Sequence, residues 1–144
     1  MSLAKPIPDK NNPITRPYWE GAANDQLRIQ RCESCGHHHH PPVAICWHCQ
    51  STNLTFDAVS GRGKVYTFTV VHDQRNPIFD RYTPFVLVRV ELDDAPGVVV
   101  LASLVGAKTD QVKIGTAVQV EFESIADGVK IPQFRLVGEA GEVR

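Results

Sequence analysis

The four cysteines of this chain lie close together in two Cys-x-x-Cys pairs. Cys32 and Cys35 form the first pair, Cys46 and Cys49 form the second, and ten residues separate the pairs. A Cys-x-x-Cys turn lets two thiolates converge on one ion, and Gly36, after the first pair, accepts the backbone angles that such a turn demands. Two such turns facing each other form a tetrahedral four-cysteine site, the usual arrangement of structural zinc. Because this site leaves no open position for water, we expect it to stabilise the fold and to take no part in catalysis.

The sequence disfavours two other uses of the cysteines and leaves a third open. Disulfides require an oxidising compartment, but residues 1–15 contain three prolines and no apolar run. We therefore find no secretory signal and expect a cytoplasmic chain with reduced thiols. A redox-active pair is disfavoured because two pairs this close together favour a shared ion. A rubredoxin-type iron site uses the same four thiolates, so the spacing leaves iron open beside zinc.

A run of four histidines, residues 37–40, lies between the two cysteine pairs. Because four thiolates already satisfy the ion, we expect these histidines to form a solvated loop with weak adventitious affinity for nickel or zinc. His48 lies inside the second pair, where side chains usually point away from the metal. Pro41 and Pro42 stiffen the return of the chain toward the second pair.

Length and charge limit the classes of protein to consider. The 144 residues suffice for one ordinary domain, or for a small domain plus a metal module. The chain has 15 basic and 16 acidic residues, and this balance counts against a general nucleic-acid binder, which normally shows a basic excess. No stretch approaches the apolar length of a membrane span, so we expect no membrane association.

The sequence pattern divides the chain into four segments. Residues 1–16 are rich in proline and asparagine and are predicted to form an extended arm. Residues 17–60 combine a short helix, expected over residues 17–26, with the metal ribbon. Residues 61–138 follow a glycine-rich turn and show an all-β pattern. Residues 139–144 are expected to form a flexible tail.

Alternating apolar residues predict two strands in the ribbon, over residues 27–31 and 54–59. Five further strands are expected in the all-β segment, at residues 64–72, 85–92, 98–104, 118–123 and 130–137. Five strands with short turns and one longer insert after the third suit a small Greek-key barrel of the OB-fold type. A β-sandwich is the alternative, but it usually needs seven strands. The predicted fold class is mainly β: a short helix and a zinc ribbon, followed by a five-stranded OB-fold barrel.

The order of ribbon, turn and barrel resembles a known family. The similar stretches run from about residue 17 to residue 137 and comprise residues 18–21, 30–36, 41–42 with 46–49, 60–72 and 131–134. The family consists of acyl-CoA-associated proteins that join a rubredoxin-like zinc ribbon to an OB-fold, catalogued as domain of unknown function thirty-five. The histidine run departs from the family pattern, because relatives usually vary more in composition there.

The resemblance implies a non-catalytic accessory or scaffold subunit. Members of the family associate with thiolase-like enzymes, or with hydratases and aldolases of steroid and fatty-acid degradation. In some complexes the barrel helps to shape the channel for the CoA-bound acyl chain. The resemblance therefore implies a partner enzyme of lipid or steroid metabolism, with acyl-CoA at the interface. Whether the chain also self-associates is left open.

The residues themselves also favour binding over catalysis. The chain contains no Gly-x-Ser-x-Gly motif and no Gly-rich phosphate-binding motif. His72, at the end of the first predicted barrel strand, is the best lone candidate for acid–base chemistry. A strand-end histidine held by local hydrogen bonds is the more common case, however. We therefore predict no intrinsic enzymatic activity.

A binding site for CoA needs cations for the phosphates and apolar surface for the pantetheine arm. The candidates that combine the two lie at the module junction and in the following loop: Arg62, Lys64, Arg75, Phe79, Arg81 and Tyr82. The alternative is that these are ordinary surface residues. Tyr18 and Trp19, on the predicted helix, are candidates either for packing within the chain or for docking a partner.

The alternative function is single-stranded nucleic-acid binding, which OB-folds perform with a basic groove and stacking aromatic side chains. Tyr66, Phe68 and Phe85 are the candidates for stacking. We expect all three to point inward as core residues, and together with the neutral charge this expectation disfavours nucleic acid as a ligand.

Overall fold

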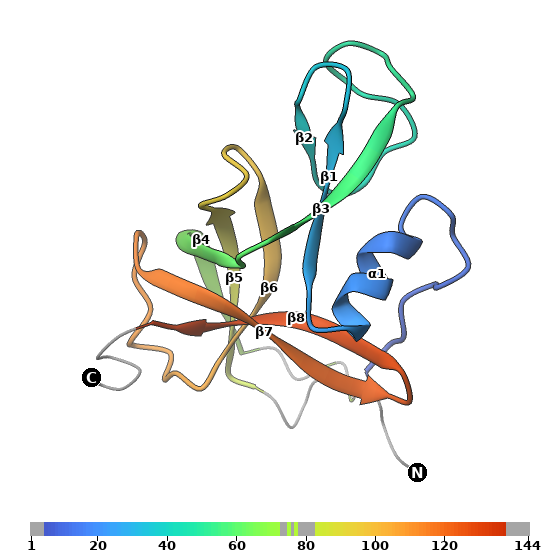
Figure 1. Cartoon of the computed structure of the whole chain (residues 1–144). Coiled ribbons are helices and arrows are strands. Elements are labelled where there is room, and N and C mark those ends of the chain that lie inside the picture. Colours follow the sequence, from blue (N-terminus) through green and yellow to red (C-terminus); the bar gives the residue numbers. More distant parts are fainter. Residues whose placement is uncertain (1–4, 73–74, 76, 78–82, 138–144) are drawn as a thin grey trace.

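The computed structural model describes residues 5–72, 75, 77 and 83–137. A small ribbon sheet stands on a β-barrel, and one helix lies beside the base of the ribbon (Figure 1). The elements in chain order are α1 (Arg16–Ala23), β1 (Leu27–Cys32), β2 (His38–His39), β3 (Leu54–Val59), β4 (Arg62–Val71), β5 (Phe85–Leu92), β6 (Val99–Val105), β7 (Ala117–Ala126) and β8 (Val129–Leu136). Within the described part of the chain, no helix is long and apolar enough to cross a membrane.

The helix α1 ends earlier than the predicted range of 17–26. Pro17 occupies its first turn, where a missing amide hydrogen costs nothing. At the other end, Asp25 adopts a positive φ of 60°, and the amide of Gln26 bonds back to the carbonyl of Gly21 at 2.8 Å. This turn directs the chain into β1, so the helix cannot continue.

The ribbon sheet has the strand order β2-β1-β3. β1 and β3 pair antiparallel along their whole length, from Leu27 opposite Val59 to Cys32 opposite Leu54. The predicted strands over residues 27–31 and 54–59 are thus present. The two-residue strand β2 was not expected, because it lies inside the histidine run.

The remaining five strands close a barrel in the order β4-β5-β6-β8-β7, with β7 pairing back to β4. All neighbours are antiparallel except β6 and β8, which run parallel. A closed five-stranded Greek-key barrel of this kind is the OB-fold, so the predicted fold class is confirmed.

A β-bulge in β4 changes which residues of that strand face the core. Val65 pairs with Val90 and Thr67 pairs with Arg89, so Tyr66 is an extra residue between them. Tyr66 follows the buried Val65, so it faces outward and is 55% exposed, and the extra residue reverses the alternation of faces beyond it. Phe68, beyond the bulge, packs against the core as predicted. The expectation that Tyr66 points inward was wrong.

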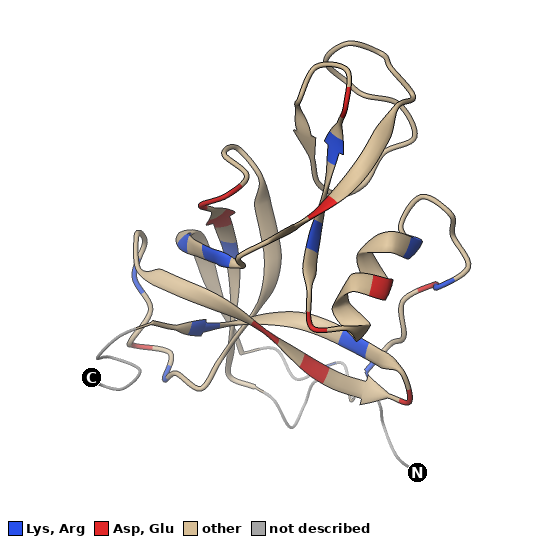
Figure 2. Ribbon diagram, viewed as in Figure 1, with Lys and Arg blue, Asp and Glu red and all other residues tan. Residues whose placement is uncertain are grey.

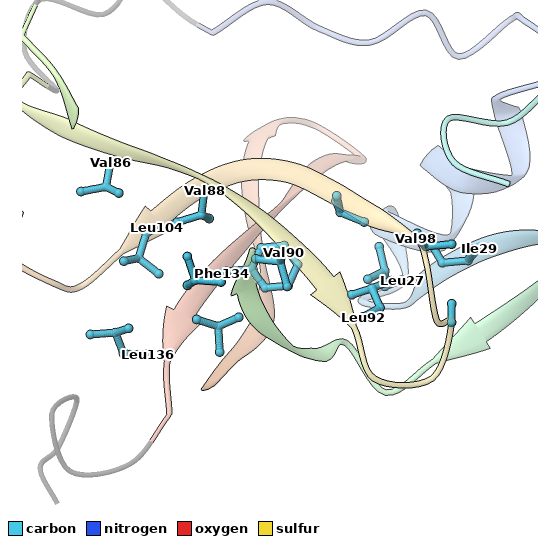
Figure 3. Packing of buried hydrophobic residues seen from close by; sticks show 14 of the residues in the cluster. Leu27, Ile29, Val86, Val88, Val90, Leu92, Val98, Leu104, Phe134 and Leu136 are labelled. Atoms are coloured by element: carbon cyan, nitrogen blue, oxygen red, sulfur yellow. The ribbon is translucent and has the colours of Figure 1, made fainter. Parts of the chain in front are cut away.

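One hydrophobic core joins the barrel to the base of the ribbon (Figure 3). Every second residue of β5 contributes to it, and Phe134 of β8 is fully buried. Leu27 and Ile29 of β1 lie in the same cluster, beside Leu92 and Val98. The lower ribbon, made of β1 and β3, is therefore fixed to the barrel by apolar packing. The upper ribbon, residues 33–53, projects from the barrel (Figure 1).

Candidate metal centre and ligand face

The four cysteines meet at the top of the ribbon. Cys32 ends β1, Cys35 lies in the following turn, and Cys46 and Cys49 lie in the segment between β2 and β3. Their Sγ atoms lie within 4.8 Å of one another. Cys32 and Cys49, and likewise Cys35 and Cys46, approach to 3.6 Å. Sulfur atoms at tetrahedral Zn–S distances lie about 3.8 Å apart, so the four cysteines are arranged for metal binding.

Each cysteine pair is held by a tight turn. The amide of Gly36 donates to the carbonyl of Cys32 at 2.7 Å, and the amide of Gln50 donates to the carbonyl of Cys46 at 2.9 Å. Both turns end in the left-handed region, with φ of 82° at Gly36 and 66° at Gln50. Glycine accepts this conformation freely, as the sequence predicted for the first turn, whereas glutamine adopts it against its steric preference.

The thiols strongly influence one another's ionisation. Burial opposes ionisation of Cys32, but the amides of Cys35 and Ser34 and the adjacent thiols outweigh it and lower the pKa of Cys32 to about 6. The amide of His37 favours the thiolate of Cys35, but burial and the neighbouring thiols outweigh it and raise the pKa of Cys35 to about 12. Four negative charges therefore cannot gather here without a cation, which is the charge that a divalent metal ion supplies.

The histidine run is not a solvated loop, and that expectation was wrong. β2 pairs with β1, with His39 opposite Gln30, and this pairing turns the His39 ring toward the cysteines. The ring is only 1% exposed, and its Nε2 lies 3.2 Å from Sγ of Cys46. His40 lies against the ring of Tyr18 at 5.3 Å, and burial lowers the pKa of His40 to about 4.

A buried glutamine, which the sequence analysis missed, holds the segment leading to the second cysteine pair. Gln30 is 3% exposed, although its neighbours in the sequence suggested an ordinary polar strand position. Its side-chain amide donates to the carbonyl of Val43 at 2.9 Å and accepts from the amide of Val43 at 2.8 Å. The Gln30 side chain thus makes the two hydrogen bonds to the backbone of Val43 that a neighbouring strand would otherwise make. No sequence pattern distinguishes such a glutamine from an exposed one.

Of the two roles considered for Tyr18, packing within the chain and docking a partner, its position in the fold favours packing. Tyr18 is 6% exposed and belongs to the core cluster, and burial raises the pKa of its phenol above its ordinary value. Its ring contacts Trp19 edge to face, with centroids 4.9 Å apart. Trp19 is half-buried and lines a surface pocket with Lys10 and Glu20, so part of its ring remains accessible.

Of the predicted CoA-binding residues, the structure describes Arg62, Lys64 and Arg75, and these three do not all lie at the module junction. Arg62 and Lys64 are exposed at the start of β4, whereas Arg75 follows the end of that strand. The eight residues from Lys64 to Val71 extend about 23 Å in a strand. Phe79, Arg81 and Tyr82 lie outside the described residues. His72 is exposed at the end of β4.

A groove on the outer side of the barrel was also missed. Phe85 and Leu87 alternate with the buried residues of β5 and therefore face outward, contrary to the expectation for Phe85. Together with Ser103 and Val105 of β6 and with Gln133 of β8, they line a groove of about 340 Å³.

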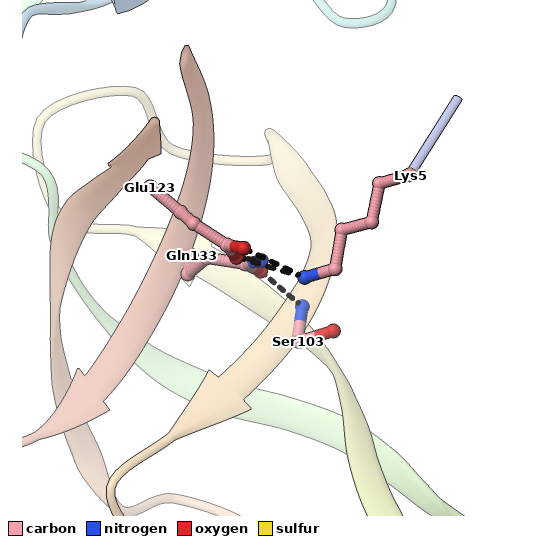
Figure 4. Close-up of polar contacts among 4 residues, drawn as sticks. All are labelled: Lys5, Ser103, Glu123 and Gln133. Carbon is pink, nitrogen blue, oxygen red and sulfur yellow. Dashed lines mark hydrogen bonds and ion pairs between the residues drawn. The ribbon is translucent and has the colours of Figure 1, made fainter. Parts of the chain in front are cut away.

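The N-terminal arm closes one side of this groove (Figure 4). Lys5 pairs with Glu123 of β7 at 2.8 Å, and Gln133 donates to the same carboxylate at 2.8 Å. The amide of Ser103 in turn donates to Gln133 at 3.0 Å. This chain of contacts ties the arm to β6, β7 and β8. The sequence analysis predicted neither the groove nor the position of the arm beside it.

Farther along the same outer surface the side chains become basic. Arg89 follows Leu87 on the outer face of β5, and its guanidinium lies 6.0 Å from the ring centroid of Tyr66. Basic residues also occur along β4 (Figure 2). Lys64 stands directly opposite Glu91, which offsets part of the positive charge.

Comparison with known proteins identifies the family of this chain. Residues 19–55 match the family model described as "ChsH2, rubredoxin-like zinc ribbon domain", and residues 57–123 match "ChsH2, C-terminal OB-fold domain". A relative from Methanocaldococcus jannaschii, named "DUF35 domain-containing scaffold protein", is 34% identical over 98 residues, 67% of this chain and 67% of that protein. The chain belongs to the DUF35 family. The family resemblance seen in the sequence is thereby confirmed.

Two further relatives of this DUF35 chain carry names that include an enzyme. The "3-oxo-4,17-pregnadiene-20-carboxyl-CoA hydratase alpha subunit" of Mycobacterium tuberculosis is 37% identical over 110 residues, which cover 76% of this chain and 34% of that protein. A "Probable enoyl-CoA hydratase alpha subunit" of Thermomonospora curvata is 33% identical over 118 residues, 82% of this chain and 36% of that protein. This chain therefore spans about a third of the length of these two hydratase subunits.

A solved structure covers more of the fold. A chain of the "Ltp2-ChsH2(DUF35) aldolase" superimposes with a TM-score of 0.79 and 31% identity, over 87% of this chain and 95% of that chain. In that protein a DUF35 chain of nearly the same extent occurs in an aldolase.

Proposed function

We propose that this chain is a non-catalytic accessory subunit that associates with an enzyme acting on acyl-CoA substrates of lipid or steroid metabolism. The relatives support this role, because they are named as scaffold proteins, as hydratase alpha subunits and as part of an aldolase. The partner would be a thiolase-like enzyme, a hydratase or an aldolase. This chain would contribute a binding surface for the substrate and the partner, and the partner would contribute the catalytic residues.

The metal centre fits a structural role in such a subunit. We propose zinc as the ion, with Cys32, Cys35, Cys46 and Cys49 as its ligands. Four soft thiolate donors suit zinc and leave no open coordination position for a substrate. The same donors suit iron, and metal analysis of the protein as purified separates the two.

One observation carries the proposal for the ligand: the outer face of β5 changes from apolar to cationic along its length. Phe85 and Leu87 line the groove, and Arg89 follows on the same face. Residues on one face of a strand repeat every two positions, so Arg89 lies about 7 Å beyond Leu87. An acyl or pantetheine chain would lie in the groove, with the CoA phosphates toward Arg89 and Lys64. The groove of about 340 Å³ is at the small end of ligand sites, in keeping with a surface completed by a partner.

Calorimetry with octanoyl-CoA, CoA and octanoate tests the ligand site. We expect octanoyl-CoA to bind more tightly than either fragment, and Leu87→Trp, which fills the groove, to weaken octanoyl-CoA at least tenfold. Ile45→Trp, an equally bulky change at an exposed ribbon position, is the matched control. Equal binding of all three ligands, unchanged by Leu87→Trp, would show that this groove is not the site.

Co-expression tests the accessory role. We expect one of the thiolase-like, hydratase or aldolase subunits of the source organism to co-elute with this chain, and the complex to turn over acyl-CoA faster than that subunit alone. Turnover of an acyl-CoA by this chain alone would contradict the non-catalytic role.

Single-stranded nucleic acid is a second candidate ligand, favoured by the exposed ring of Tyr66. This ring stands beside Arg89 and near the exposed Lys64, which is the combination that OB-folds use to stack bases and bind phosphates. A salt-dependent gel shift that Tyr66→Ala abolishes would favour this candidate. No shift at low salt would exclude it.

A further inference from the structure

His39, one of the four histidines of the run, contacts the cysteine cluster. It belongs neither to the Cys-x-x-Cys motifs nor to the residues of the proposed function. His38 and His39 are successive strand residues, so their side chains point to opposite faces of the ribbon. Only His39 is buried, and its ring packs between His37 at 5.1 Å and Trp47 at 5.3 Å. The ring therefore has little freedom to leave the cysteine cluster.

The contact between His39 and Cys46 has a defined direction. Nε2 of His39 lies 3.2 Å from Sγ of Cys46, and a thiolate only accepts hydrogen bonds. Nδ1 of the same ring is buried without a hydrogen-bond partner among the described residues. A proton on Nδ1 would thus be a buried donor without an acceptor, whereas a proton on Nε2 meets the sulfur. The arrangement selects the neutral tautomer with its proton on Nε2.

Cys46 then receives two hydrogen bonds. The backbone amide of His48 lies 3.3 Å from its Sγ, and the imidazole of His39, from strand β2, is the second donor at 3.2 Å. Donors of this kind disperse the charge of a thiolate and fix its direction. Within the described part of the chain, the side-chain contacts of the other three cysteines are with cysteine sulfur atoms alone.

We propose that His39 is a positioning residue of the metal centre: its Nε2–H group donates to the Cys46 thiolate and holds that thiolate as a ligand. This inference rests on the four-cysteine centre and is independent of the proposed enzyme partner. Mutation of a residue that hydrogen-bonds to a metal ligand typically lowers metal affinity by about 10- to 100-fold.

Cadmium-113 NMR of the full chain tests the contact directly. We expect one cadmium ion with the chemical shift of a tetrathiolate site, and a scalar coupling between this nucleus and the Hε2 proton of His39. Such a coupling passes through the hydrogen bond and the Cys46 sulfur, and ring packing alone does not produce it. A tetrathiolate signal without this coupling overturns the inference alone, whereas failure to take up cadmium overturns both the inference and the metal centre.

Three variants separate donation from packing. His39→Phe keeps a ring but removes the donor, and we expect it to release metal to a chelator at least tenfold faster. His39→Gln places an amide donor near the same point and should restore most of the lost retention. His38→Phe, on the opposite face of β2, is the control and should match the unmodified chain. Equal release rates for His39→Phe and His39→Gln would contradict a donor role, and a cadmium signal of three thiolates and one imidazole in the unmodified chain would show that His39 is a direct ligand instead.

Discussion

The upper ribbon and the barrel are stabilised in opposite ways. Of residues 33–53, only His39 and Cys46 are buried. In the barrel, β5 alone places Val86, Val88 and Val90 in the core with 2% exposure or less. A segment without apolar burial cannot offset the entropy lost on ordering, so the upper ribbon needs specific bonds. Thiolates, the Gln30 amide and two tight turns supply them, whereas the barrel needs only packing.

The largest effect that separates the two regions should come from the metal ligands. Structural zinc contributes roughly 10–16 kcal/mol in small modules, more than any local contact of the ribbon can replace. We expect Cys32→Ser, or treatment with a strong chelator, to unfold the upper ribbon while the barrel stays folded. Hydrogen exchange followed by NMR would show amides of residues 33–53 losing protection and those of β5 and β6 keeping it.

The control for this change lies in the same turn. The side chain of Ser34 is exposed and bonds to the Ser51 hydroxyl at 2.9 Å, and its amide, which acts on Cys32, is kept in the variant. Ser34→Ala should therefore leave the protection of both regions unchanged. An upper ribbon that stays protected after metal removal would mean that the contrast between the two regions is wrong.

The second largest effect should come from the barrel core and should reach both regions. Phe134 is fully buried, and its truncation to alanine leaves a cavity that costs about 3–5 kcal/mol. Because Leu27 and Ile29 share this core, urea denaturation of Phe134→Ala should show the lower ribbon and the barrel unfolding together. Ile114→Ala, at a position 68% exposed, should change stability by less than about 0.5 kcal/mol. Separate transitions for β1 and β5 would contradict a shared core.

The contrast also explains which features the sequence revealed. Period-two alternation marks strands that bury one face, so β3 and β5 begin and end where predicted. Cysteine spacing marks the metal centre because two tight turns require it. Both signals are local, and each follows from one physical rule.

The missed features depend on contacts between distant segments. His39 is buried because β2 pairs with β1, and a two-residue strand leaves no periodic signal. Tyr66 and Phe68 lie on different faces because of a bulge, which adds one residue to the strand and leaves no signal in the composition. Of the candidate CoA-binding residues that the structure describes, Arg62 and Lys64 lie at the start of β4 and Arg75 lies beyond its end. Only the barrel's strand order reveals the groove beside Leu87.

A moderate effect, confined to the upper ribbon, is expected at Gln30. Gln30→Leu keeps the volume but leaves the amide and carbonyl of Val43 without their partner, which costs about 1–3 kcal/mol. Hydrogen exchange should report this loss in the segment before Cys46 and not in the barrel. Gln26→Leu is the control, because Gln26 is exposed and its side chain accepts an exposed hydrogen bond from Arg28. Equal losses in both variants would show that the buried amide is not a structural partner.

The smallest effects compare the two cysteine turns with each other. Gly36→Ala meets no atom within 4 Å, so its cost of about 1 kcal/mol should come only from the φ of 82°. Gln50→Gly relieves the same kind of strain at φ 66°, but glycine also loosens the unfolded chain, so we expect a gain smaller than the loss at Gly36. Rates of metal release to a chelator measure both, with Gly36→Ala faster and Gln50→Gly slower than the unmodified chain. Faster release in both variants would contradict this prediction. It would mean that contacts of the Gln50 side chain stabilise the second turn by more than the backbone strain at Gln50 destabilises it.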